Sequence, residues 1–89
     1  MTKYLVDSAV ADIINDFNRI AFSHDLFPRI IGVSVDNSLP VPFRAVFRIS
    51  SIPRYEVLKA LNVRFNQVVI IVNHEADVVI EVYDDTLPF

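Results

Sequence analysis

The feature that most constrains this fold is an apolar stripe near the start of the chain. Its members recur with the period of an α-helix: Val6, Val10, Ile13, Ile14, Phe17, Ile20 and Ala21. Most residues between them are polar, as expected for a helix with one face on a core and the other in water. We predict a helix over residues 7–23, with Asp7 accepting hydrogen bonds from the amides of its first turn.

Residues 3–6, ahead of this helix, fit either a short strand or an earlier start of the helix. A pattern of only four residues does not separate the two. We favour a strand, because Asp7 and Ser8 are residue types that commonly begin a helix. A strand here gives a β-α-β-β-α-β order with one added strand, as in ferredoxin-like folds. A helix here gives an αββαββ order.

The rest of the chain predicts four strands and a second helix. Residues 29–35 are rich in branched apolar side chains, and residues 43–49 alternate between apolar and polar types, as half-buried strands do. A short helix follows over residues 53–62, with its proline in the first turn. Residues 67–73 are apolar on both faces, which favours a central strand. Residues 78–83 alternate again and form the last strand.

These elements predict an α+β fold, with two helices packed on one face of a four- or five-stranded, mostly antiparallel sheet, in ferredoxin-like or αββαββ order. Residues 1–83 form a single compact domain, and residues 84–89 form an acidic-hydrophobic C-terminal tail. The expected core comprises Val10, Ile13, Ile14, Phe17, Phe47, Leu58, Leu61, Val69, Ile71 and Ile80.

The apolar content exceeds what a chain of this length can hide. Apolar residues make up 53% of 89 residues, yet a domain this small buries only about 60–65% of its unfolded surface. The surplus predicts an exposed apolar patch, which commonly marks an interface. We place this protein interface, and a homodimer contact, at Val46, Val79 and Tyr83 on outward strand positions, and at Leu87 and Phe89 in the tail. The tail docks either in a partner or in its own fold.

A second interpretation is single-stranded RNA or DNA binding. Basic and aromatic residues alternate along residues 43–48, as they do on platforms that stack bases. The candidate basic patch consists of Arg29, Arg44, Arg48 and Arg64. The net charge of −3 argues against binding to a duplex backbone by bulk electrostatics.

Two polar clusters contain residue types that catalyse reactions or bind metals. His24 and Asp25 follow the first helix, where a histidine interacts favourably with the helix dipole. His74, Glu75 and Asp77 lie in a short connection and match no spaced zinc motif. The chain has no cysteine and one glycine, so thiol chemistry and glycine-rich phosphate loops are excluded. We predict no catalytic, cofactor-binding or metal-binding residues, and a protein that is not an enzyme.

The chain shows no sign of a membrane span. Its longest uninterrupted apolar run, from Val68 to Val72, has five residues, whereas a spanning helix needs about 20. We expect no membrane partner, and the absence of cysteine fits the cytoplasm. The function expected is a small non-enzymatic protein–protein interaction module that self-associates, of the kind that phages and viruses encode as accessory factors.

Overall fold

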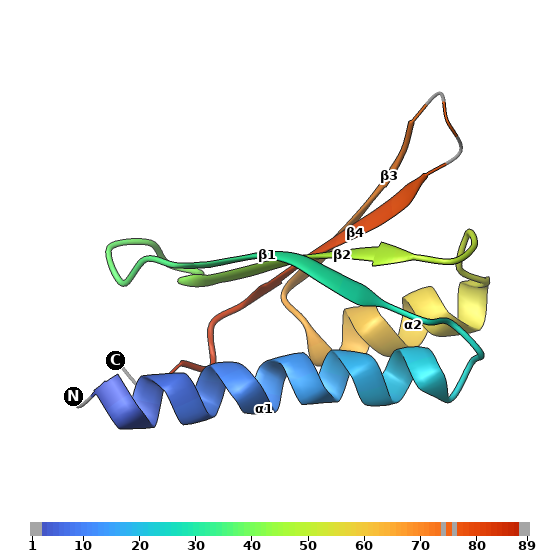
Figure 1. Ribbon diagram of the computed structural model, residues 1–89. Helices are drawn as coiled ribbons and strands as arrows, with labels where there is room; N and C mark the ends of the chain where they lie inside the picture. The colour runs from blue at the N-terminus through green and yellow to red at the C-terminus, as the bar shows by residue number, and fades with distance from the viewer. Residues whose placement is uncertain (1–2, 74, 76, 88–89) are drawn as a thin grey trace.

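The computed structural model describes residues 3–73, 75 and 77–87 as two helices and one four-stranded antiparallel sheet (Figure 1). The elements are α1 (Lys3–Phe22), β1 (Arg29–Val35), β2 (Phe43–Ile49), α2 (Tyr55–Arg64), β3 (Gln67–Val72) and β4 (Val78–Asp84). The strands lie in the order β1-β2-β4-β3, and both helices lie below the sheet in the view of Figure 1. Of the two helices in this described part, neither has the length and apolar character to cross a membrane.

The start of α1 differs from the prediction. The helix already begins at Lys3, so the strand expected at residues 3–6 is wrong and the order is α-β-β-α-β-β. Asp7 accordingly lies inside the helix and does not cap it. The physical reason is that four residues extend an existing helix at the cost of propagation alone, with one backbone hydrogen bond gained for each residue added.

The end of α1 is a Schellman turn built on an aspartate. Asp25 has a φ of 60°, the left-handed conformation that glycine usually supplies after a helix. The Leu26 amide donates to the Ala21 carbonyl at 3.0 Å, and the Asp25 amide donates to the Phe22 carbonyl at 3.2 Å. Leu26 is buried beyond this turn. The turn therefore points the chain back toward the sheet.

The second helix begins and ends later than predicted. Arg54 is the residue before its first turn, so Pro53 lies outside the helix. Asn62 does not stop the helix; its side-chain amide donates to the Leu58 carbonyl at 2.9 Å, within the helix. Val57 and Leu61 are its buried residues. An apolar face of only two fully buried side chains explains why the sequence defined this helix poorly.

The two central strands are the ones with alternating sequences. Along β2 and β4 every second residue is buried, which confirms the predicted faces. The interpretation of β3 as central is wrong, because it lies at one edge of the sheet. Its register places Val69 opposite Glu81 and Ile71 opposite Val79, on the sheet face that carries Arg44. Ile71 is therefore 45% exposed rather than part of the core.

The core forms where α1 meets β2. The rings of Phe17 and Phe47 stack with centroids 3.8 Å apart, and Phe65 packs at 6.2 Å from Phe17. Five of the predicted core residues are buried: Ile13, Phe17, Phe47, Leu61 and Ile80. Val10 and Ile14 pack against this core while only partly buried, and Leu58 is half-buried.

Removal of the Phe17 ring should cost more stability than any other single truncation in α1. We expect Phe17→Ala to lower the free energy of unfolding by about 3–5 kcal/mol, because it opens a cavity against Phe47. Tyr55→Ala is the matched aromatic control, since Tyr55 is 74% exposed at the start of α2, and it should cost less than about 1 kcal/mol. Urea unfolding followed by circular dichroism measures both. Equal losses would contradict this description of the core.

Candidate functional site

The open sheet face, defined by Arg44, Val46 and Arg48 of β2 with Val79, Glu81 and Tyr83 of β4, contains a closed polar network. The Arg44 guanidinium donates to the Glu81 carboxylate at 2.8 Å and to the Tyr83 hydroxyl at 3.3 Å. The Tyr83 hydroxyl in turn donates to Glu81 at 2.9 Å. Val46, Val79 and Tyr83, the three strand residues predicted to form an interface, are each half-buried around this network. The open sheet face is thus more polar than the sequence indicated.

This network changes the acidity of its members. The hydrogen bond to Tyr83 and then the one to Glu81 raise the pKa of Arg44. The hydrogen bond from Arg44, followed by the one from Tyr83, lowers the pKa of Glu81 below its usual 4.5. Glu81 is therefore charged at neutral pH, and its ionised form is the one that stabilises the fold.

The contribution of Glu81 should disappear in acid. A carboxylate whose pKa is lower in the folded state stabilises the fold above its unfolded pKa, and that stabilisation is lost as the pH falls through the folded pKa. We expect wild-type protein to be more stable than Glu81→Gln at pH 7, with the difference closing below about pH 4. Urea unfolding across this range measures it. Glu56→Gln, at an exposed position with no ion pair among the described residues, is the control. A difference for Glu81→Gln that is constant with pH would contradict the assignment.

The structure places three of the four predicted patch arginines on one face of the sheet. Arg29 lies opposite Arg48 across β1 and β2, and Arg44 is on the same face. Arg44 is paired with Glu81, and Arg48 lies 4.0 Å from the Asp77 carboxylate. Arg64 is not part of this group, because it closes a separate ion-pair cluster with Asp16 and Asp84. A four-arginine patch is therefore not formed.

The cluster of Arg64 surrounds a carboxylate that sequence reasoning placed in the tail. Asp84 is the last residue of β4 and is completely buried. It accepts from the Arg64 guanidinium, and also from the amide and hydroxyl of Thr86. Arg64 reaches α1 as well, where its Nε donates to Asp16 at 2.8 Å. One arginine thus connects both helices to the end of the sheet.

The hydrogen bonds of the buried Asp84 also determine where the tail residues beyond it lie. Leu87 is 7% exposed and belongs to the chain's own core, so it does not offer an interface to a partner. The hydrogen bonds from Thr86 to Asp84 turn the chain inward at this point. Phe89, the other predicted tail contact, lies outside the described residues.

Arg64 and Arg19 both pair with Asp16, so the loss of stability on replacing each of them can be compared. Arg64→Leu leaves the buried Asp84 carboxylate without its counter-charge, and we expect a loss of about 3–5 kcal/mol in the free energy of unfolding. Arg19→Leu removes an exposed pair to the same Asp16, at 3.1 Å, and should cost less than about 1 kcal/mol. Chemical denaturation of both variants at pH 7 tests this. Similar losses would show that burial of Asp84 is not what makes the cluster important.

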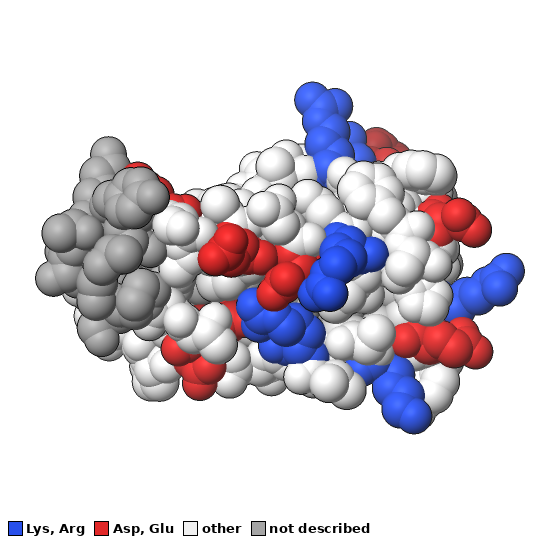
Figure 2. All heavy atoms as spheres, turned by 90° about the horizontal axis from the view of Figure 1, so that it is seen from below, with Lys and Arg blue, Asp and Glu red and all other residues white. Residues whose placement is uncertain are grey.

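The helical side of the molecule carries charges of both signs. Figure 2 shows acidic and basic side chains next to one another near the middle of this face. A shallow groove of about 640 Å³ between the helices has Ile20, Ala60 and Val63 among its apolar lining residues. Arg19, Glu56 and Lys59 are among its charged lining residues. The surface of this groove is mostly apolar, and its charged side chains come from both helices.

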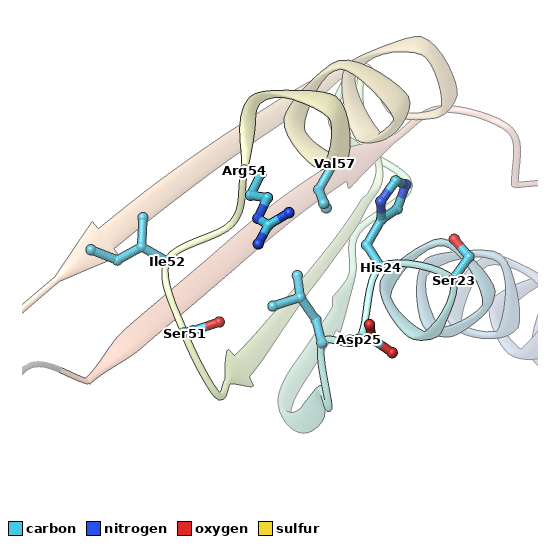
Figure 3. Close-up of a pocket in the computed structure, with 8 residues that line it drawn as sticks. Ser23, His24, Asp25, Ser51, Ile52, Arg54 and Val57 are labelled. Carbon is cyan, nitrogen blue, oxygen red and sulfur yellow. The ribbon is translucent and has the colours of Figure 1, made fainter.

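A polar pocket of about 350 Å³ lies between the end of α1 and the start of α2 (Figure 3). Ser23, His24 and Asp25 line one side, and Ser51 and Arg54 line the other. In Figure 3 Arg54 extends toward the turn that carries His24, whereas Ile52 points away. All five polar residues are exposed, so water competes for each of them. The left-handed backbone conformation of Asp25 is explained by the turn that ends α1. A catalytic role is therefore not needed to explain why Asp25 and His24 lie side by side.

The second predicted polar cluster is a hairpin connection. The backbone amides of Glu75 and Asp77 donate to the Asn73 side chain at 2.9 and 3.0 Å. His74 lies outside the described residues. Within the described ranges, no three histidine, aspartate or glutamate residues gather as a metal-binding group.

The largest departure from an ordinary surface runs along the end of α1 and the strand β1. Six large apolar side chains are between 41% and 65% exposed there, and we call them the edge strip: Phe22, Phe27, Ile30, Ile31, Val33 and Val35. The rings of Phe22 and Phe27 pack edge to face at 6.3 Å. Ile30, Val33 and Val35 lie opposite three β2 residues that are completely or almost completely buried, namely Phe47, Ala45 and Phe43.

Sequence reasoning missed the edge strip, although a signal was present. Residues 67–72 carry apolar side chains on both faces, and residues 29–35 interrupt their alternation with the adjacent pair Ile30 and Ile31, while the strands that became central alternate strictly. In a sheet with one open face, central strands need only one apolar face. The strands whose sequences do not alternate strictly therefore marked the edges.

Comparison with protein-family models, with curated proteins and with solved structures found no match to this chain. The exposed side chains of the chain itself are therefore the basis for inferring its function.

Proposed function

We propose that this chain is a small non-enzymatic protein–protein interaction module that associates with a second copy of itself through the edge strip. The observation that carries the proposal is the exposure of six large apolar side chains along one edge of the sheet. Monomeric proteins rarely leave a large apolar patch in water, and such patches commonly mark interfaces.

The position of the edge strip supports this proposal. In this proposal α1 and α2 cover the same face of the sheet. Ile30, Val33 and Val35 lie on that face too, at the edge strand beyond the two helices. These side chains are 41%, 47% and 41% exposed, directly beside buried residues of β2. The apolar core is therefore partly exposed to solvent at β1, and a second subunit would cover these side chains.

Binding of single-stranded RNA or DNA is the less favoured function. Arg29, Arg44 and Arg48 share the open sheet face, which is the observation in its favour. However, Arg44 and Arg48 already face carboxylates, and the chain carries a net charge of −3. Phosphate contacts would have to compete with these internal pairs.

Sedimentation equilibrium tests the proposal. Full burial of one apolar side chain of this size contributes roughly 1.5–3 kcal/mol before the costs of association, and the six here, which are about half exposed, gain roughly half of that each. Six on each copy are enough for a dimer with a Kd in the micromolar range or below, about 10 μM at most. At about 50 μM, above that value, we expect an average mass that lies clearly above the 10.1 kDa of the chain and rises toward twice that mass with concentration. A mass of 10.1 kDa at all concentrations would overturn self-association.

A further inference from the structure

The open edge of β1 determines how two copies could meet. We propose that the dimer forms by antiparallel pairing of β1 with β1 of a second copy, giving one continuous eight-stranded sheet across a twofold axis near Val33. This inference rests on the proposed self-association and names the surface, the partner and the orientation.

The two edges of the sheet are not equivalent. On β1 all four large apolar residues, Ile30, Ile31, Val33 and Val35, are more than 40% exposed. On β3 only Ile71 and Val72 reach that exposure, and residues 68–70 are half-buried. An edge strand also presents unpaired backbone amides and carbonyls that another strand can satisfy. The edge with the greater uncovered apolar surface gains more from a second strand.

The geometry of β1 leaves a segment suited to pairing. The register with β2 shifts between Ile30 and Gly32, and regular pairing then continues from Gly32 to Val35. Gly32 has no positive φ, and a Cβ there would meet only Val46, at 4.0 Å. Neither backbone conformation nor space within the chain therefore requires glycine. Glycine inside a strand is typical of bulges and of places where another backbone approaches closely.

The charges at the two ends of β1 favour a second copy of the chain as the partner, and an antiparallel orientation of the two strands. β1 begins with Arg29, and Asp36 follows its last residue. Antiparallel pairing near Val33 brings Arg29 of one copy alongside Asp36 of the other, and symmetry repeats this contact. Parallel pairing would place Arg29 beside Arg29, and like charges on neighbouring strands repel.

Asp36 is already held in a suitable state. Its carboxylate accepts from the hydroxyl and the backbone amide of Ser38, at 2.6 and 3.0 Å. These two hydrogen bonds, the one from the hydroxyl first, lower its pKa. The carboxylate is thus charged and oriented at neutral pH before a second copy arrives.

The size of such an interface is reasonable for this chain. Stable interfaces of standard size take about 800 Å² from each partner, which is about one seventh of the 5737 Å² surface of the chain. Pairing that uses one edge of each copy closes as a dimer and does not propagate into fibres, because it is isologous.

Two variants of the same type on opposite edges test the proposal. Val33→Lys should weaken the dimer about 100-fold or more, because two lysines would face each other at the centre of the new sheet. Val72→Lys is the matched control: Val72 is 51% exposed on β3, as Val33 is 47% exposed on β1. It should leave the Kd within about threefold of wild type, as surface substitutions away from an interface usually do. Sedimentation gives the Kd values, and circular dichroism verifies that both variants are folded.

Disulfide trapping tests the orientation without a destabilising charge. The chain has no cysteine, so each introduced thiol reports one position. Val33→Cys should crosslink to itself under mild oxidation, because disulfides form where Cα atoms come within about 7 Å. Arg29→Cys alone should not, since antiparallel pairing holds its two copies about 20 Å apart. A mixture of Arg29→Cys and Asp36→Cys chains should crosslink, because this pairing brings these two positions alongside each other.

The outcomes separate this inference from the function on which it rests. A wild-type dimer that Val33→Lys leaves intact, or that Val72→Lys dissociates instead, overturns the β1 interface while self-association stands. Efficient trapping of Arg29→Cys with itself overturns the antiparallel orientation. A wild-type chain that stays monomeric overturns both proposals.

Discussion

The stack of Phe17 on Phe47 is the contact on which the fold depends. It joins the longest helix to a central strand, with ring centroids 3.8 Å apart, and both rings are essentially inaccessible to water. Around it the inward residues of β2 and β4 supply a continuous apolar surface. Because the chain has 89 residues and no disulfide, this single core supplies most of the apolar burial that stabilises it.

A second constraint is electrostatic. Asp84 is completely buried at the end of β4, and Arg64 reaches it from α2 while also holding Asp16 of α1. Ion pairs of this kind contribute little net stability compared with apolar packing, but loss of one member leaves a buried charge uncompensated. The cluster therefore fixes which residues meet at this end of the molecule. It also turns the chain so that Leu87 packs into the core.

The apolar surplus of the sequence is found at the edges of the sheet. The edge strand β3 carries branched side chains on both faces, and β1 carries them on the core face and at its register shift, whereas the open face of the central strands holds the network of Arg44, Glu81 and Tyr83. This distribution differs from the expected one, in which the surplus lay on the open face at Val46, Val79 and Tyr83. A protein that used the open face for binding would have to disrupt hydrogen bonds, whereas the edge of β1 offers unpaired backbone and uncovered apolar side chains.

The sequence by itself determined the elements whose periodicity is long or strict: the helix around Phe17 and the alternating strands β2 and β4. Periodicity records which face of one segment avoids water, and that information is local. Strand order, the burial of Asp84 and the exposure of β1 were decided only by the tertiary structure. Each depends on residues far apart in the chain, such as Arg64 meeting both Asp16 and Asp84. A run of apolar residues looks the same at the centre of a sheet and at its edge, because only the neighbouring strand determines whether it is covered.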